Sequence, residues 1–421
     1  MPVNSRIPGL RELSVQERRT RVTEDSGVDA EVFEPQGGLV FEQADQMIEN
    51  AVGVFGVPLG IATNLTVNGR DHLVPMAIEE PSVVAAASNA ARMARGLGGL
   101  RASTSGPVMI SQVQLVDVPN PEEARFRILE VEEEILAQAN EQDPVLVELG
   151  GGARSVEVRM VPTASGTHLI VHLIVDVRDA MGANAVNTMA EALAPRLAEL
   201  SGGRSLLRIL SNKADRRLVR VRGEFDAELL GGSQVVDDIV LASDFASADP
   251  YRAATHNKGI MNGISAVVLA TGNDTRAVEA GCHSHAVRDG RYTALSRFER
   301  NTAGNLVGTL EVPLAVGLVG GATRAHPTAR AAIRILGVDS AVELGEVIAA
   351  VGLVQNLAAC RALAAEGIQR GHMALHARTL AATAGAEGQE VSKVAARLVE
   401  AGRIRQEYAR EVLDELRGTS A

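Results

Sequence analysis

Aromatic side chains are scarce in this chain. Its 421 residues include no tryptophan, three tyrosines and seven phenylalanines, so aromatic residues make up 2% of the composition. Proteins that bind single-stranded nucleic acid stack its bases on aromatic rings and attract its backbone with positive charge. The net charge here is -11, and no basic stripe runs along the sequence. Both observations argue against nucleic acid as a partner.

Cysteine, targeting and membrane patterns are also lacking. The two cysteines, Cys282 and Cys360, are too few for a disulfide framework and have no metal-ligand spacing. The first residues lack the apolar core of a secretory signal, and no run approaches the roughly 18 uninterrupted apolar residues of a spanning helix. We therefore expect a soluble, cytoplasmic protein without a membrane partner.

Lysine is the third scarce residue. Only three of the 41 cationic residues are lysines, at positions 213, 258 and 393. Lys258 lies in the string T-H-N-K-G-I-M-N-G (255–263), whose composition is typical of a polar loop. A compact ammonium can direct three donors at one oxygen and so stabilise a developing alkoxide. The alternative, that arginine-rich codon usage left one lysine here by chance, stays open from the count alone.

Length and composition predict more than one domain. At 421 residues with 46% apolar content, the chain is long enough for two or three hydrophobic cores. The pattern changes near Pro107, where about one hundred residues predict a compact α+β unit of short strands and two helices. After about Glu366, apolar residues at near-helical spacing predict a helical terminal unit.

Local patterns predict the elements that precede this change. A helix is expected at about 44–53, followed by a hairpin at 63–78 that turns at Asn68-Gly69, because this dipeptide accepts two positive φ angles. Proline suits the first position of a helix, so Pro81 is expected to place Glu80 at the N-cap of the next helix.

Several common motifs are missing. No G-x-G-x-x-G, no phosphate loop of the NTPase type and no G-x-S-x-G elbow occurs, so a standard doubly wound dinucleotide fold has no support. His372 and His376 stand four residues apart, but H-M-A-L-H lacks the glutamate of a zinc-protease helix. We therefore predict no metal site.

Four ionisable residues stand beside glycine, asparagine or proline. They are Glu80 in E-E-P-S, Lys258 in H-N-K-G, Asp274 in A-T-G-N-D and His372 in Q-R-G-H-M. Each alone is typical of a helix cap, a turn or a structural histidine. Together they supply a cation, two carboxylates and an imidazole, which make an acid–base set.

Seven strings, in order along the chain, carry a specific resemblance. The sequence resembles hydroxymethylglutaryl-CoA (HMG-CoA) reductase, in its soluble bacterial form (class II), over nearly its whole length. The matching strings are E-N-A-V-G (49–53), E-E-P-S-V-V-A-A-A-S (79–88), D-A-M-G-A-N (179–184), T-H-N-K-G-I-M-N-G (255–263), A-T-G-N-D (270–274), V-G-L-V-G-G-A-T (316–323) and G-H-M-A-L-H-A-R (371–378).

This resemblance implies a reaction and four catalytic roles. The family interconverts (S)-HMG-CoA and (R)-mevalonate plus CoA, using two nicotinamide cofactors in successive hydride transfers. Glu80 matches the family's proton-donating glutamate, and Lys258 matches the lysine that polarises the substrate carbonyl. Asp274 matches the aspartate that links these two by hydrogen bonds. His372 matches the histidine that protonates the departing CoA thiolate.

The resemblance also implies binding residues. Positions that match the dinucleotide motif are Asp179, Met181, Gly182 and Asn184. Positions that match substrate contacts are Ser82, Asn212, Arg252 and Asn262. Asp143 matches an aspartate of NAD-preferring members. Its carboxylate can accept hydrogen bonds from the ribose hydroxyls and would repel a 2′-phosphate. NAD(H) is therefore expected ahead of NADP(H), although Asp143 as a solvated acid at a helix end is the alternative.

The fold that the resemblance implies is α+β. A large mixed α/β domain, residues 1–106 and 212–365, is expected to hold HMG-CoA. A small inserted ferredoxin-like domain at 107–211 is expected to hold the dinucleotide, and a helical C-terminal domain at 366–421 is expected to close over the site. The family works as a homodimer or larger homo-oligomer with the active site at the interface.

Two alternatives remain at this point. One is another CoA-thioester reductase built on the same scaffold. The other is a non-enzymatic helical scaffold, in which the polar strings only cap helices and form turns.

Overall fold

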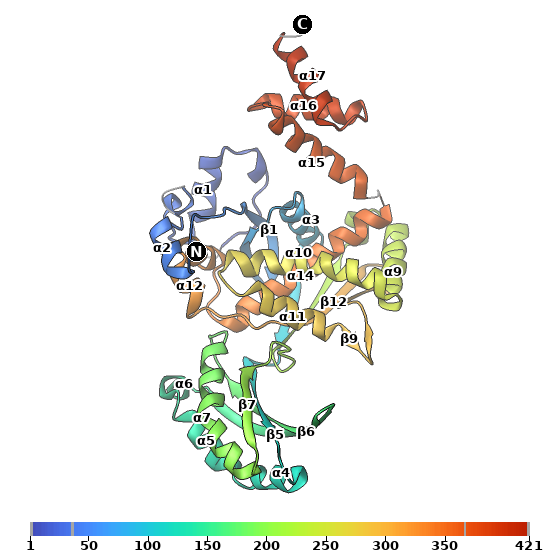
Figure 1. Ribbon diagram of the computed structural model, residues 1–421. Coiled ribbons are helices and arrows are strands. Elements are labelled where there is room, and N and C mark those ends of the chain that lie inside the picture. The colour runs from blue at the N-terminus through green and yellow to red at the C-terminus, as the bar shows by residue number, and fades with distance from the viewer. Residues whose placement is uncertain (1–2, 35–37, 366–367, 419–421) are drawn as a thin grey trace.

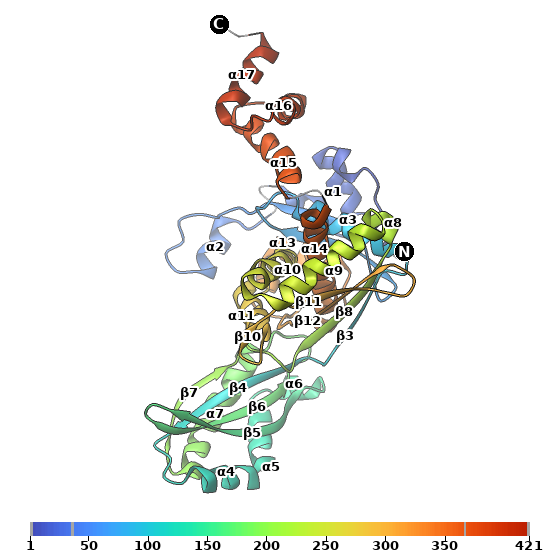
Figure 2. The same cartoon turned by 90° about the vertical axis from the view of Figure 1, so that its right-hand side faces the viewer.

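Three bodies follow one another along the long axis of the molecule. The computed structural model describes residues 3–34, 38–365 and 368–418, with side chains except at 322 and 368–375. Figures 1 and 2 show a small domain at one end, a large central domain, and a helical unit at the other end. The chain leaves the large domain, builds the small one and returns, so the small domain is an insertion.

A six-stranded sheet forms one wall of the large domain. Its strands, in spatial order, are β11 (Ser296–Arg300), β12 (Leu306–Pro313), β8 (Leu218–Phe225), β3 (Leu100–Thr104), β1 (Leu59–Val67) and β2 (Arg70–Ala77). Only β1 and β3 pair in parallel. Side chains alternate along β8, so that Val219 and Val221 are buried while Arg220 and Arg222 are exposed. One side of the sheet therefore faces water, as antiparallel sheets permit.

Apolar helices cover the other side of this sheet. The central helix is α14 (Ala341–Ala365), which packs against α10 (Pro250–Ala270), α3 (Val83–Arg95) and α9 (Ser233–Ala248). Within the described residues, α14 is the one helix long and apolar enough to cross a membrane, but 67% of its apolar window is buried inside the protein. This burial is that of a core helix.

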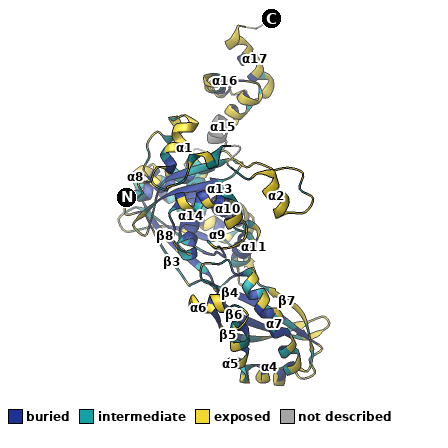
Figure 3. Ribbon diagram, turned by 90° about the vertical axis from the view of Figure 1, so that its left-hand side faces the viewer, coloured by how far each residue is buried: buried dark blue, intermediate teal, exposed yellow. Residues whose placement is uncertain are grey.

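The remaining elements of the large domain are short and lie around this core. They are the 3-10 turns η1 (Leu10–Glu12) and η2 (Ala30–Phe33), the helices α1 (Val15–Thr23), α2 (Phe41–Met47), α8 (Ala227–Leu230), α11 (Thr275–His285), α12 (Gly321–Ala325) and α13 (Pro327–Leu336), and the strands β9 (Val287–Arg288) and β10 (Arg291–Tyr292). Figure 3 shows α2 as an exposed element that projects from the body on a loop.

Two local predictions have different outcomes. The hairpin is confirmed, since β1 and β2 flank a turn in which Asn68 and Gly69 have φ angles of 51° and 83°. The helix expected at 44–53 is present, but its predicted end is wrong, because α2 stops at Met47 and residues 48–58 are irregular. Asn50 has a φ of 57°, which no α-helix accommodates.

The small domain has the βαββαβ order of a ferredoxin-like fold. Its sheet is antiparallel, with the spatial order β5 (Gly152–Thr163), β6 (Gly166–Asp176), β4 (Val108–Val116) and β7 (Arg204–Leu210). Its helices are α4 (Pro121–Glu130), α5 (Glu132–Asn140), α6 (Pro144–Glu148) and α7 (Ala183–Ser201). These elements bury a core that is distinct from that of the large domain. The α+β class predicted from the sequence is confirmed.

The C-terminal unit is helical. It consists of α15 (Ile368–Thr383), α16 (Gln389–Glu400) and α17 (Gln406–Arg417), which share a third apolar cluster. Both views show this unit projecting beyond the large domain rather than lying over it.

Candidate active site

The segment around Lys258 is helical, and the expectation of a polar loop was wrong. Asp249 caps α10 by accepting a hydrogen bond from the backbone of Arg252, and Pro250 occupies the first turn. One face of this helix is buried, including Ile260 and Ile264. Glycine lets it pack closely, because a Cβ at Gly263 would lie 2.9 Å from the Val351 oxygen of α14. The polar residues of this string therefore occupy one helix in a fixed order.

Lys258 meets Glu80 on the accessible face of α10. The Lys258 Nζ atom donates to Glu80 Oε2 over 2.7 Å, and Asn262 Nδ2 donates to the same oxygen over 3.3 Å. Lys258 and Asn262 are four residues apart, so both project from one side of the helix. The Lys258 side chain is 60% exposed and that of Glu80 is 32% exposed, so a ligand can reach this pair.

Glu80 does not occupy the N-cap position that the sequence suggested. Helix α3 starts at Val83, its N-cap is Ser82, and Glu80 lies in a bend two residues earlier. Ser82 has a φ of 74°, and its hydroxyl donates to the Pro81 carbonyl, so it does not cap the helix by side chain. Left-handed backbone at a serine is uncommon and costs about 1–3 kcal/mol, and such strain clusters at functional sites.

A buried polar layer fixes α10 from behind. His256 Nε2 lies 2.6 Å from Ser296 Oγ, which donates over 2.6 Å to Asn356 Oδ1 of α14. Asn257 bonds the chain at Thr293 and Leu295, each over 2.9 Å. Burial and, to a smaller extent, the charge of Arg252 lower the pKa of His256 to about 4, so this imidazole is neutral at physiological pH. The helix therefore cannot rotate freely beneath Lys258.

The D-A-M-G-A-N string forms the loop between β6 and α7. Gly182 is the N-cap of α7 with a φ of 102°, and a Cβ there would lie 2.7 Å from Val177, so this position requires glycine. The Asp179 carboxylate accepts from the Ala341 amide over 2.8 Å, and its carbonyl accepts from Leu318 over 2.9 Å. Asp179 therefore anchors the loop to the large domain.

A cleft of about 910 Å³ opens where this loop meets the large domain. Of the five residues that the resemblance assigned to the cofactor, Asp143, Met181, Gly182 and Asn184 line it, whereas Asp179 does not. Asp274, which the resemblance assigned to catalysis, lines it as well. The first turn of α7 points into this cleft, and free backbone amides at a helix start suit a diphosphate. The cleft thus has the size and the donors for a dinucleotide.

Arg217 and Gly317 support this loop, and the sequence did not single them out. Arg217 is 4% exposed, and it donates to the carbonyls of Ala180 and Met181, each over 3.1 Å, and to that of Val316. Burial lowers the pKa of Arg217 to about 10, whereas Asp179 opposes this shift, so the guanidinium stays charged. A Cβ at Gly317 would lie 2.4 Å from the Met181 nitrogen, so the loop requires glycine there.

Asp274 lies far from Lys258 within one chain, and the expected hydrogen-bonded link is not made there. Twelve residues of α10 separate Lys258 from the helix end at Ala270, a distance of about 18 Å at 1.5 Å per residue. The Asp274 carboxylate instead caps α11 and lies 3.2 Å from Arg276. Lys258 lies near the middle of α10, whereas Asp274 follows the C-terminal end of that helix and caps the next one.

The remaining predicted residues have varied positions. Arg252 is half-buried on the first turn of α10, and its guanidinium has no hydrogen bond or ion pair within the described residues. Asn212 is exposed in the connection between β7 and β8, near Gly281 of α11. His372 falls in α15, but its side chain lies outside the part of the chain that the structure describes. Among the described residues, no group of three or more potential metal ligands occurs.

Comparison with known proteins places this site in a family. The family model for hydroxymethylglutaryl-coenzyme A reductase matches residues 14–377. A 3-hydroxy-3-methylglutaryl-coenzyme A reductase of Archaeoglobus fulgidus is 56% identical over 99% of this chain and 95% of its own length. A probable enzyme of the same name from Borreliella burgdorferi is 37% identical over 78% of this chain and 76% of its own.

Solved structures agree with these sequence matches. The reductase of Streptococcus pneumoniae superimposes with a TM-score of 0.83 at 41% identity, covering 97% of this chain and 99% of that one. The class II reductase of the same organism, bound to NADPH in open conformations, gives a TM-score of 0.81 at 42% identity, covering 96% of this chain and 100% of that one. The fold and site define a nicotinamide-dependent oxidoreductase, and the chain belongs to the HMG-CoA reductase family, class II.

Proposed function

We propose that the protein interconverts (S)-HMG-CoA and (R)-mevalonate plus CoA. The observation that carries this proposal is the Lys258–Glu80–Asn262 cluster on α10, in a chain that also builds a dinucleotide-sized cleft around Asp179–Asn184. Reduction of a thioester to an alcohol consumes two hydrides, and a bound reduced nicotinamide supplies each of them. The groups of the chain itself have to manage charge and protons.

Each residue of the cluster has a defined task in this chemistry. The Lys258 ammonium stabilises the oxyanion that forms when the thioester carbonyl is attacked, because a preorganised cation acts most strongly where negative charge develops. Glu80, hydrogen-bonded to Lys258 and Asn262, lies where it can deliver the proton to the final alkoxide. His372 protonates the CoA thiolate, a step that suits an imidazole near neutral pH.

The active unit in this proposal is a homodimer or a larger homo-oligomer. Residues 47–57 carry several exposed apolar side chains, with Val52 99% and Phe55 93% exposed, and they border the cofactor cleft. Apolar residues this open to water mark a contact surface. A second copy can bring its Asp274 and cofactor cleft to the Lys258–Glu80 pair of the first. The hydrogen-bonded link that one chain cannot form is then made between two.

The C-terminal unit at 366–421 delivers His372 in this scheme. It projects away from the large domain and has its own apolar cluster, so it can move as a rigid body relative to the rest of the chain. In this proposal the chain divides into four segments, with boundaries after residues 106, 211 and 365. Closure would exclude water from the intermediates. Cys282 and Cys360 are both buried and unpaired, which suits the reducing cytoplasm that we infer as the compartment.

NAD(H) is the cofactor that we propose as preferred. Asp143 lines the cleft and is the N-cap of α6, where its Oδ1 atom accepts from the Leu146 amide over 3.0 Å. The remaining carboxylate oxygen can accept from a ribose hydroxyl and repel a 2′-phosphate. The neighbour bound to NADPH shows that class II members also take the phosphorylated cofactor. Equal kcat/KM values for both cofactors, or an unchanged ratio in Asp143→Ala, would contradict this preference.

The stoichiometry of the reaction tests the proposed function. HMG-CoA should oxidise two NADH per CoA released, measured at 340 nm with a thiol reagent in the same cuvette. A CoA-thioester reductase that stops at the aldehyde would oxidise one, and a scaffold protein would oxidise none. Acetyl-CoA and succinyl-CoA as substrates provide the control for another reductase on this scaffold.

A further inference from the structure

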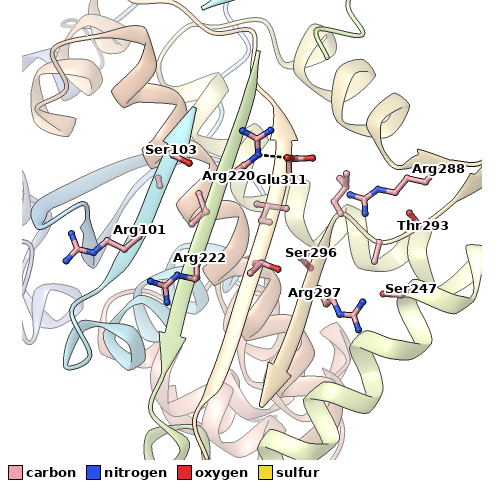
Figure 4. Close-up of a pocket in the computed structure, with 16 residues that line it drawn as sticks. Arg101, Ser103, Arg220, Arg222, Ser247, Arg288, Thr293, Ser296, Arg297 and Glu311 are labelled. Atoms are coloured by element: carbon pink, nitrogen blue, oxygen red, sulfur yellow. Dashed lines mark hydrogen bonds and ion pairs between the residues drawn. The ribbon is translucent and has the colours of Figure 1, made fainter. Parts of the chain in front are cut away.

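A second concavity lies on the open side of the six-stranded sheet. It has a volume of about 710 Å³ and shares no lining residue with the cofactor cleft or with the Lys258–Glu80 pair. Figure 4 shows its labelled side chains on neighbouring strands, on the loop that leads into β11 and, for Ser247, on helix α9. We call it the arginine concavity, because its charged lining residues are Arg101, Arg220, Arg222, Arg288, Arg297 and Glu311.

Strand register brings like charges together in this concavity. Arg101 of β3 lies opposite Arg222 of β8, which lies opposite Thr309 of β12, which in turn lies opposite Arg297 of β11. One row across four strands therefore presents three guanidinium groups and a hydroxyl, without a carboxylate. Like charges directly opposite in a sheet are destabilising.

Three of these arginines form no hydrogen bond or ion pair among the described residues, namely Arg101, Arg222 and Arg288. Arg222 is close enough to Glu224 to lower the pKa of that carboxyl, and Arg297 pairs with Glu299 over 3.2 Å. The one carboxylate, Glu311, is already engaged by Arg220 Nε over 2.6 Å and by His285 over 3.2 Å. The concavity therefore holds cationic donors in excess of the acceptors that the chain supplies.

We propose that the arginine concavity binds a small phosphorylated anion, with phosphate on the Arg101–Arg222 row. The planar guanidinium fork matches phosphate oxygens in pairs, and an anion between Arg101 and Arg222 removes their mutual repulsion. Ser103 and Thr309 add neutral donors. The volume fits a metabolite rather than a macromolecule. No aromatic side chain lines the site, so charge rather than base stacking carries recognition.

Inorganic pyrophosphate is the probe that tests this site, by titration calorimetry on the full-length protein. The test variant is Arg101→Gln/Arg222→Gln. The control is Arg405→Gln/Arg410→Gln, which removes the same charge from exposed positions in the C-terminal unit. We expect the Kd for pyrophosphate to rise at least about tenfold in the test variant and to stay unchanged in the control. Added salt should weaken binding to the unmodified protein. Equal Kd values in all three proteins would overturn the proposal.

Two further readouts separate the possible sources of phosphate. If the ligand is a free metabolite, KM for HMG-CoA and KM for the nicotinamide cofactor should both stay unchanged in the test variant. A parallel rise of KM for HMG-CoA would assign these arginines to the diphosphate of the substrate, and the proposal of a separate site would be wrong. A change in oligomer size in the test variant, with no pyrophosphate bound by the unmodified protein, would instead assign the concavity to a second copy of the chain.

Discussion

The middle of α10 and the chain beyond its C-terminal end differ in the chemistry that they can support. At Lys258 and Asn262 the helix presents charged and polar side chains to Glu80, where an oxyanion can be stabilised. Beyond Ala270 the chain reaches Asp274 and a cleft built largely from backbone, glycine and the start of α7. The first region is suited to a reacting carbonyl, and the second to a dinucleotide. Twelve residues of α10, about 18 Å, separate Lys258 from the helix end at Ala270, and we propose that two copies of the chain combine these half-sites.

The half-site at Lys258 is the place where the largest effect is expected. Lys258→Arg retains the charge, but a planar guanidinium cannot replace a compact ammonium aimed at one oxygen. We expect kcat for HMG-CoA reduction to fall about a hundredfold to a thousandfold, with an unchanged melting temperature. The control is Lys213→Arg, an exposed lysine that pairs only with Asp215. If Lys258→Arg has near-normal kcat, any cation suffices and the assignment is wrong.

Replacement of His372 should separate the thioester steps from the aldehyde step. His372→Ala removes the proposed proton donor to the CoA thiolate, so reduction of HMG-CoA should slow about a hundredfold. Reduction of free mevaldehyde releases no thiolate and should be little affected. His376→Ala is the matched control on the same helix. Equal losses on both substrates would give His372 a different role.

Replacement of Arg217, which supports the loop at the cofactor cleft, should have a smaller and more selective effect on activity. Arg217→Lys retains a buried cation but cannot reach three carbonyls at once. We expect the Kd for the nicotinamide cofactor to rise about tenfold, while KM for HMG-CoA and the reduction of mevaldehyde at saturating cofactor stay unchanged.

Arg216→Lys is the control for this positioning role, because Arg216 is exposed and pairs with Glu157 over 2.7 Å. Parallel weakening of both substrates in Arg217→Lys would indicate general damage to the fold rather than loss of loop position.

The buried layer behind Lys258 should show itself in stability rather than in rate. The pKa of His256 is about 4 in the folded protein and 6.5 as an ordinary value, so the unfolded chain binds more protons between these limits. The stabilisation is complete above pH 6.5 and is lost as pH falls toward 4, by about 3 kcal/mol in total.

The gap in melting temperature between the unmodified protein and His256→Gln should therefore shrink as pH falls from 7 to 5. His72, His172 and His326 also have lowered pKa values, but they contribute equally to the pH dependence of stability in both proteins. A constant gap would show that folding does not lower the pKa of His256.

Much of the architecture could be predicted from sequence, because it depends on local pattern. The hairpin at Asn68-Gly69 follows from turn chemistry, the α+β class was implied by the family resemblance, and both were confirmed. The loop predicted at Lys258 failed because His256 and Asn257 read as solvated, although they are buried against Ser296 and the chain at Thr293. Burial of polar groups depends on tertiary partners that no local pattern specifies.

The separation of the half-sites could not be predicted either. Lys258 and Asp274 are only 16 positions apart in the sequence, which suggests that they are close in space. Most of that interval is straight helix, which holds the two residues apart. Arg217 carried no signal at all, since one arginine among many is indistinguishable until its carbonyl partners are known. The role of His372 and the domain boundaries remain predictions.

Subunit complementation tests the central claim of two half-sites most directly. Lys258→Ala and Asp274→Ala each inactivate the protein in this account, and the two purified variants are unfolded together, refolded and assayed. If the sites lie between subunits of a symmetric dimer, half of the assemblies are mixed and each has one intact site, so about a quarter of normal activity should return. No recovery in verified mixed dimers would show that each chain builds its own complete site, and would contradict the account.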